Sequence, residues 1–104
     1  MNATTLNALA DPNRLRIIEL LRGQPYSVGD IADKLWLRQP QVSKHLSVLS
    51  DAGLVVAQTA AQRRIYHLQP TPFKELDSWL ATFKVIWEDR LSALDEYAQV
   101  LKKQ

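Results

Sequence analysis

The sequence predicts a mainly α-helical protein with one small β-hairpin. Most of the chain places apolar residues three or four positions apart, which is the spacing of one helix face. Two short runs, LVVAQT and RRIYHLQ, are instead rich in β-branched and aromatic residues, as strands are. A length of 104 residues, 46% of them hydrophobic and 23% charged, suits one soluble domain with one modest core.

The N-terminal part predicts two helices. TTLNALA forms a short helix that places Leu6 and Leu9 on a shared face. Asp11-Pro12 opens the second helix, because a capping side chain followed by proline is a typical helix start. The apolar residues of NRLRIIELLR spread around more than half of that helix, which indicates the central helix of the core. Gly23 and Pro25 end it.

The next two helices form a helix-turn-helix. Ser27 caps the first, and the apolar residues of VGDIADKL follow a helical template without a miss. The second runs from about Gln39 to Ala52, and Gly53 is placed to end it in a left-handed conformation. About three residues join the two helices, so the chain must turn a sharp corner between them.

The two predicted strands form a hairpin after this helix pair. They are separated by Ala60, Ala61 and Gln62, a segment without glycine. Two-residue primed turns favour glycine, so we expect a longer loop here.

The C-terminal segment predicts one long helix with an apolar row. From Phe73 to Leu101 the apolar residues follow steps of three and four, with Arg90 interrupting and Leu91 beside it as a substitute. A helix of almost thirty residues cannot bury this row against a core made by the other seventy, so a partner helix is the expected cover. With Leu6 and Leu9, the predicted dimer interface comprises Phe73, Leu76, Leu80, Phe83, Trp87, Leu91, Leu94, Tyr97 and Leu101.

The basic residues are concentrated in the first part of the chain. Residues 1–70 hold eight Arg/Lys against five Asp/Glu, a net of +3, whereas residues 71–104 hold five against six, a net of −1. Asp51 is the only acid between residues 38 and 67. This distribution is typical of a nucleic-acid footprint, but a solvated face would look the same, and charge alone leaves both open.

Several function classes are disfavoured. Ser43 and His45 are two apart on a helix and diverge, so they form no catalytic dyad, and we expect no enzyme. There is no cysteine, and His45 and His67 are the only histidines, so we expect no metal and no cofactor. No run is long enough to span a bilayer and the start lacks a secretory layout, which predicts a cytoplasmic protein without a membrane partner.

The motifs, taken in order, resemble the ArsR family of winged-helix transcription regulators. LNALADPNRLRIIELL is similar to that family's opening, SVGDIADKL to its first helix-turn-helix element, QPQVSKHLSVLSDAGLV to its recognition helix, and QRRIYHL to its second wing strand. The last segment, with Trp79, Trp87 and RLSALDEY, is similar to a metal-independent branch. The resemblance covers nearly the whole chain.

The resemblance implies a winged helix-turn-helix with a long C-terminal dimerisation helix. It makes 1–104 a single winged-helix domain, with 11–70 as the DNA-binding core, a wing at about 54–69, and 1–10 and 71–104 as dimerisation helices. It also implies a homodimer on double-stranded DNA, usually a repressor at an inverted-repeat operator, with half-sites about one helical turn, ~10 bp, or a multiple of it apart. By position, the implied DNA contacts are Arg38, Gln39, Gln41, Ser43, Lys44, His45, Arg63 and Arg64.

The residue types fit such a role. Val42, Leu46 and Leu49 form one thin apolar stripe, and at about 100° per residue Gln41 and Lys44 point away from it. Glutamine can pair with adenine and lysine can donate to guanine in the major groove. Two readings stay open beside it: a winged helix that docks a protein, and a regulator gated by an unknown organic effector at Trp79, Phe83 and Trp87.

Two positions depart from the family pattern. Trp36 stands where the turn usually has glycine, and a left-handed tryptophan there costs about 1–2 kcal/mol. Arg38 replaces a serine cap, which costs ~1 kcal/mol, while its guanidinium gains reach to a phosphate.

Overall fold

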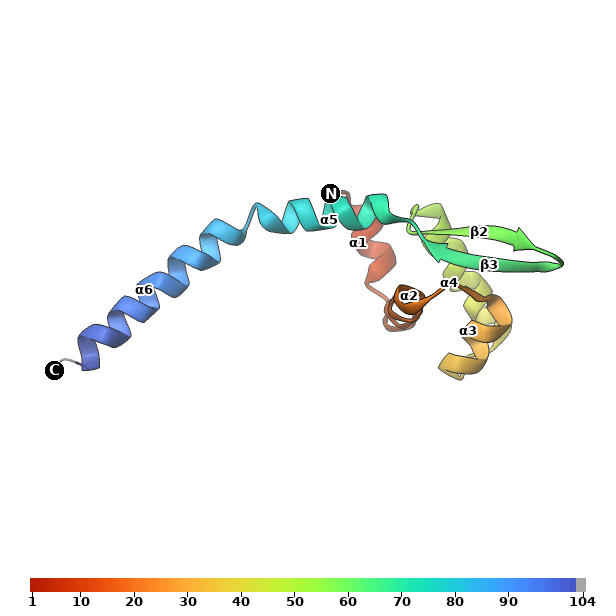
Figure 1. Ribbon diagram of the computed structural model, residues 1–104, viewed down its shortest axis with the longest axis horizontal. Helices are drawn as coiled ribbons and strands as arrows, with labels where there is room; N and C mark the ends of the chain where they lie inside the picture. Colours follow the sequence, from red (N-terminus) through yellow and green to blue (C-terminus); the bar gives the residue numbers. More distant parts are fainter. Residues whose placement is uncertain (103–104) are drawn as a thin grey trace.

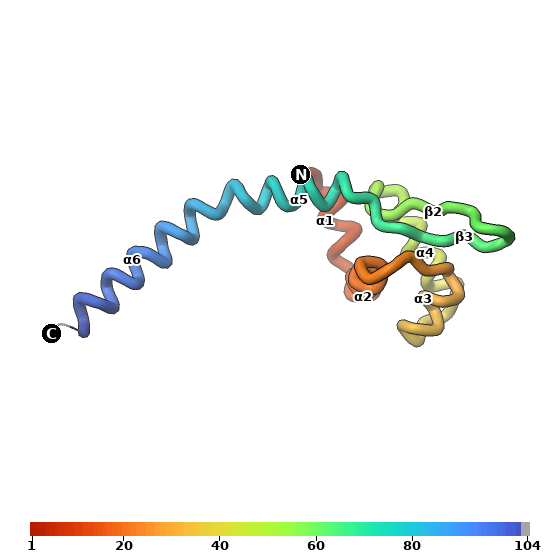
Figure 2. Tube along the Cα trace, in the orientation of Figure 1, coloured from red at the N-terminus to blue at the C-terminus, as the bar shows by residue number. Residues whose placement is uncertain are grey.

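The protein is a small winged body from which one helix projects. The computed structural model describes residues 1–102, and its Cα atoms span 70 × 26 × 20 Å. Figure 1 shows α6 extending away from the body, while α3 and the β2–β3 hairpin lie at the opposite end of the molecule. The tube in Figure 2 shows the same separation along the chain trace. No helix within residues 1–102 is long and apolar enough to cross a membrane.

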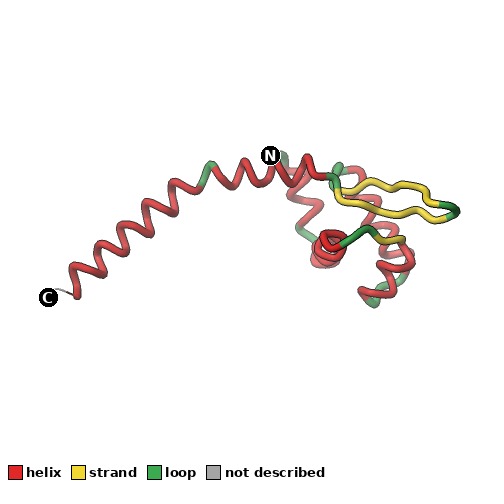
Figure 3. The backbone as a smooth tube through the Cα atoms, viewed as in Figure 1, coloured by secondary structure: helices red, strands yellow, loops and turns green. Residues whose placement is uncertain are grey.

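Helices dominate, with three antiparallel strands (Figure 3). This confirms the predicted fold class, a winged helix-turn-helix whose C-terminal segment is helical. The elements in chain order are α1 Ala3–Leu9, α2 Pro12–Gly23, β1 Tyr26–Ser27, α3 Val28–Leu35, α4 Gln39–Asp51, β2 Val55–Ala60, β3 Arg63–Leu68, α5 Pro70–Ala81 and α6 Lys84–Lys102.

The first three helices begin at side-chain caps. Asn2 accepts a hydrogen bond from the Thr5 N–H at the start of α1. At the start of α2, Asp11 accepts from the N–H groups of Asn13 and Arg14, and Ser27 accepts from the first turn of α3. The capping starts predicted at Asp11-Pro12 and Ser27 are therefore confirmed, and each satisfies N–H groups that a helix end leaves without an intrahelical partner.

A tight left-handed turn joins α3 to α4. Trp36 has φ 57° and ψ 42°, and its N–H donates to the Ala32 carbonyl. The Leu37 N–H donates to the same carbonyl at 3.0 Å, which completes a Schellman-type end of α3. Gly53 has φ 77° after α4, as predicted for its terminator. The corner expected from the short connection is present, and tryptophan occupies the left-handed position.

The core lies where α2, α3 and α4 meet the sheet. Ile17 of α2, Ile31 of α3 and Leu54 after α4 are completely buried. The anchoring stripe of α4 is buried to the same degree, with Val42, Leu46 and Leu49 each 0% exposed. Burial of side chains of this size contributes about 1.5–3 kcal/mol each.

The sheet differs from the predicted hairpin in two ways. A short third strand, β1, pairs with β3 through Tyr26 opposite Tyr66, which the sequence analysis did not predict. The expected longer hairpin loop is wrong, because Ala60 pairs with Arg63 and only two residues turn the chain. Ala61 takes φ 57° at the first turn position. The pairing of β2 with β3 therefore imposes a primed-type turn without glycine.

The C-terminal helical segment is interrupted once. α5 ends at Ala81 and α6 begins at Lys84, whereas the sequence pattern predicted one unbroken helix over this stretch. The Thr82 hydroxyl donates to the Trp79 carbonyl at 2.6 Å. A side chain that enters the backbone ladder in this way bends helices. The last two residues of the predicted dimerisation segment, 103–104, lie outside the described residues.

The apolar row of this segment is largely uncovered. Phe73 and Leu76 are half-buried against the body, but no residue of α6 is buried. On α1, Leu6 is exposed and Leu9 is half-buried, while Thr5 and Ala8 face the core. The exposed members of the predicted dimer interface are Leu6, Leu80, Phe83, Trp87, Leu91, Leu94, Tyr97 and Leu101.

Candidate nucleic-acid interface

Helix α4 presents a polar outer surface at the corner of the body. Gln39, Gln41, Ser43 and Lys44 are all exposed, while the apolar stripe on the other side of the helix is buried. The division predicted from the sequence between anchoring and outward residues is confirmed. A helix with this pattern can enter a major groove without uncovering the core.

Gln41 has a second task at the start of α4. Its side-chain oxygen accepts from the Arg38 N–H at 3.3 Å, which is the glutamine half of a capping box. The arginine side chain has no acceptor and cannot form the other half. The amide of Gln41 keeps its NH₂ to donate, and its oxygen keeps one lone pair beside the one that the Arg38 N–H occupies.

His45 faces the body more than the other polar residues of α4. Its side chain is half-buried. The Arg14 N–H donates to the Asp11 carboxylate and lowers the pKa of that carboxyl, with smaller contributions from the Asn13 N–H and from the charges of His45 and Arg14. His45 thus lies near enough to the start of α2 to act on Asp11. Its predicted DNA contact remains a prediction.

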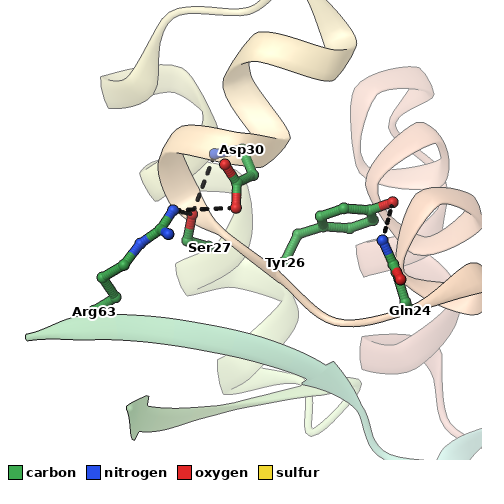
Figure 4. A network of polar contacts seen from close by, with 5 residues as sticks. All are labelled: Gln24, Tyr26, Ser27, Asp30 and Arg63. Carbon is green, nitrogen blue, oxygen red and sulfur yellow. Dashed lines mark hydrogen bonds and ion pairs between the residues drawn. The ribbon is translucent and has the colours of Figure 1, made fainter. Parts of the chain in front are cut away.

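Arg63 links the wing to α3 (Figure 4). Its Nη2 donates to Ser27 Oγ at 2.7 Å and lies 3.1 Å from Asp30 Oδ2. Ser27 Oγ also accepts from the Asp30 N–H at 3.2 Å, so one hydroxyl serves both the helix cap and the wing. The sequence analysis gave Arg63 as a DNA contact and predicted no partner for it within the chain. The structure adds an intramolecular role and leaves its other guanidinium N–H groups available.

β1 is held in the same region by its tyrosine. Gln24 Nε2 donates to the Tyr26 hydroxyl at 2.8 Å, as Figure 4 shows. The Lys34 ammonium lies 5.2 Å from the centre of the Tyr26 ring, within cation–π range. Together with the Arg63 contacts, these interactions fix the start of α3 against the sheet.

Arg64 lies on the side of β3 that faces α4. A surface hollow of about 480 Å³ separates the two elements, and its walls include Gln39, Ser43, Ser47 and Arg64. The Arg64 guanidinium lies 5.8 Å from the centre of the Tyr66 ring. Asp51 lines the same hollow, but Arg64 makes no ion pair within residues 1–102 and can reach an anion.

Sequence reasoning missed three contributors to this surface. Ser27 was predicted only as a helix cap and Asp30 was given no part in the interface, because their partner Arg63 lies more than thirty positions away. Ser47 was not singled out, although Ser43, Ser47 and Ser50 follow helical spacing and all line the hollow beside the wing. That spacing was the available signal.

No group of three His, Cys, Asp or Glu side chains is arranged to hold a metal ion within residues 1–102. The residues that do converge are amides, hydroxyls and cations on α4 and β3. This chemistry suits hydrogen bonding to base edges and phosphates. A helix-turn-helix with such a helix beside a basic wing defines the class of DNA-binding transcription regulators.

Residues 11–56 match the family model described as "Bacterial regulatory protein, arsR family". The HTH-type transcriptional regulator Rv2034 of Mycobacterium tuberculosis is 40% identical over 97 residues, which cover 93% of this chain and 85% of that protein. The chain belongs to the ArsR family. It is therefore a DNA-binding transcriptional regulator and not an enzyme.

Two further similarities agree with this membership. The transcriptional repressor SdpR of Bacillus subtilis is 32% identical over 76 residues, covering 73% of this chain and 84% of that protein. A solved structure, the ArsR-like transcriptional regulator from Rhodococcus sp. RHA1, has a TM-score of 0.73 at 25% identity and covers 92% of this chain and 91% of its own.

The two wing arginines should respond differently to substitution. Arg63→Ala removes contacts to Ser27 and Asp30, so unfolding free energy should fall by about 1 kcal/mol, discounted for their partial exposure. Arg64→Ala should change stability by at most about 0.5 kcal/mol. It should reduce the slope of log affinity against log salt by about 0.9, because one phosphate contact is lost.

Thermal melts and duplex titrations at several salt concentrations measure both effects. An Arg63→Ala protein that melts like the parent would contradict the proposed anchoring. An unchanged salt slope for Arg64→Ala would remove that residue from the phosphate contacts.

Proposed function

We propose that the chain is a homodimeric, sequence-specific repressor that binds an inverted-repeat operator. One observation carries the dimer: α6 is a 19-residue helix with no buried side chain. Most helix stability in proteins comes from packing of an apolar face, and this face has nothing to pack against within residues 1–102. A second copy presents the same apolar row, and two such rows can cover each other.

The proposed dimer helix and the proposed DNA-binding surface lie at opposite ends of the chain. Figure 1 displays α6 at one end of the long axis and the helix-turn-helix with its wing at the other. A dimer joined through α5 and α6, together with Leu6 and Leu9 of α1, leaves both recognition surfaces uncovered. Two-fold symmetry of the protein then requires two-fold symmetry of the DNA site.

On each half-site, Arg38, Gln39, Gln41, Ser43 and Lys44 are the proposed contacts from α4. Arg63 and Arg64 supply phosphate contacts from the wing. His45 is assigned a flanking position because its side chain is half-buried. In this proposal residues 1–104 form one domain, in which 11–70 bind DNA and 1–10 with 71–104 form the dimer interface. Such a regulator acts on DNA in the cytoplasm.

Repression without a metal is the proposed mode. The chain has no cysteine and two histidines, so thiolate or multi-histidine coordination has few ligands to draw on. Repression itself is supported by the similarity to SdpR, which is named as a transcriptional repressor. An organic effector at the aromatic residues has less support, because Trp79 and Phe83 pack edge to face at 5.2 Å.

Leu94→Glu should dissociate the dimer. Leu94 is 64% exposed in the single chain and lies in the middle of α6. A carboxylate in an apolar helix interface loses its hydration without gaining a partner. The variant should sediment as a monomer at concentrations where the parent is a dimer, and its affinity for a duplex selected from a random pool should fall at least about tenfold.

Gln99→Glu is the matched control, since it adds the same charge to α6 away from the row. It should remain dimeric. A parent protein that sediments as a monomer, or a Leu94→Glu protein that stays dimeric, would refute this dimer interface.

Gln41→Ala should relax base preference at one position of each half-site. A good bidentate pair discriminates against the wrong base by about 1–3 kcal/mol, and alanine cannot form it. Selection from random duplexes reports the change directly. Ser50→Ala, at the far end of the polar face of α4, serves as the comparison. It should leave the base preference at that position of the half-site unchanged. An unaltered consensus for Gln41→Ala would show that this side chain reads no base.

A further inference from the structure

Trp36 is the least expected residue on the surface. Its side chain is 92% exposed, although it is the largest apolar side chain of the helix-turn-helix. Its backbone has φ 57°, and only Ala61 shares this property among the non-glycine residues of the described chain. Exposure of an indole and a left-handed backbone are both unfavourable in the free protein.

The fold does not use the indole. The Trp36 and Leu37 N–H groups both donate to the Ala32 carbonyl, and Arg16 Nη2 donates to the Leu35 carbonyl at 2.8 Å. These contacts involve backbone groups or other side chains, so they survive any substitution at position 36 that keeps the backbone N–H. Glycine is the preferred residue at such a left-handed helix end. The tryptophan side chain is therefore free to contact another molecule.

The position of Trp36 limits what its side chain can contact outside the chain. The turn that carries Trp36 leads directly into α4, and Figure 3 shows the loop between these two helices in the half of the molecule away from α6. In helix-turn-helix docking, the start of the recognition helix reaches base edges while the preceding helix crosses the DNA backbone. A side chain between these two helices lies beside the sugar–phosphate backbone at the edge of the groove.

The local charge agrees with this location. Between Asp33 and Asp51, which border the segment, the charged residues are Lys34, Arg38 and Lys44. Neither Arg38 nor Lys44 makes an ion pair within residues 1–102. An indole N–H is a donor without an acceptor, and phosphate oxygens are acceptors without a donor.

We propose that Trp36 contacts the DNA backbone at the edge of the groove read by α4. The indole N–H donates to a phosphate oxygen and the ring packs on an adjacent deoxyribose. The inference rests on the proposed docking of α4 in the major groove. Contacts to phosphate and sugar hold the protein in register without reading sequence, so Trp36 supports affinity and leaves base preference unchanged.

Trp36→Gly separates binding from folding. It relieves the left-handed strain and removes an exposed apolar side chain, so the variant should melt at a higher temperature than the parent. Its affinity for a fluorescein-labelled duplex of random sequence at low salt should fall about tenfold, the size of a lost hydrogen bond to a charged group with its ring contact. A substitution that stabilises the protein while weakening its function marks a side chain that serves function rather than folding.

Two further variants give the controls. Ala61→Gly relieves the same kind of strain in the wing turn and measures the rise in melting temperature that such relief gives alone. Trp36→Phe keeps a ring but loses the indole N–H, and its affinity for the duplex should lie between those of the parent protein and Trp36→Gly. The tryptophan emission that Trp36→Phe removes belongs to Trp36, and this component should change when the duplex is added.

The outcomes are distinct. Duplex binding by Trp36→Gly at parental affinity, or a lower melting temperature for that variant, overturns the inference while leaving the proposed function intact. Emission from Trp36 that ignores the duplex overturns it as well. A parent protein that binds no duplex at all overturns the proposed function, and this inference falls with it.

Discussion

The packing of α4 is the constraint on which the rest of the structure depends. Val42, Leu46 and Leu49 are each 0% exposed, and they hold the helix against a core that includes Ile17 and Ile31. One narrow stripe is enough because each side chain is completely removed from water. The remaining surface of α4 is then free to be polar. A wider apolar face would anchor the helix more firmly but would leave fewer positions for donors and acceptors.

The wing is placed by a smaller, polar set of contacts. Arg63 reaches from β3 to the cap of α3, where Ser27 Oγ accepts from both the helix and the wing. This arrangement ties the orientation of the hairpin to the start of the helix-turn-helix. It also partly neutralises the Arg63 charge, since the Asp30 carboxylate lies 3.1 Å from the Arg63 guanidinium. Arg64 makes no ion pair within residues 1–102 and lines the hollow beside α4.

The sequence predicted those parts of the structure that depend on local patterns. The caps at Asp11 and Ser27, the stripe of α4 and the glycine after it all follow from spacing and residue type, and all were confirmed. The polar character of the candidate interface could be predicted in the same way, because it is the complement of the stripe. The outward positions of Gln41 and Lys44 needed only the helical period.

The errors came from interactions between distant or competing groups. Ala61 adopts a positive φ because the pairing of two strands leaves room for only two residues, although alanine disfavours that conformation. At the break in the C-terminal helix the Thr82 hydroxyl donates to the Trp79 carbonyl, a contact that bends helices and that an apolar periodicity does not reveal. The two-residue strand β1 and the partner of Arg63 depend on tertiary contacts across more than thirty positions. No local pattern contains that information.

Methylation interference on a selected duplex examines most directly whether α4 reads the major groove. Dimethyl sulfate places methyl groups on guanine N7 in the major groove and on adenine N3 in the minor groove. Docking of two recognition helices predicts that guanine N7 methylation blocks binding in two patches, whose centres lie about one helical turn, ~10 bp, or a multiple of it apart. Interference restricted to adenine N3, or a single patch, would contradict a pair of recognition helices in successive major grooves.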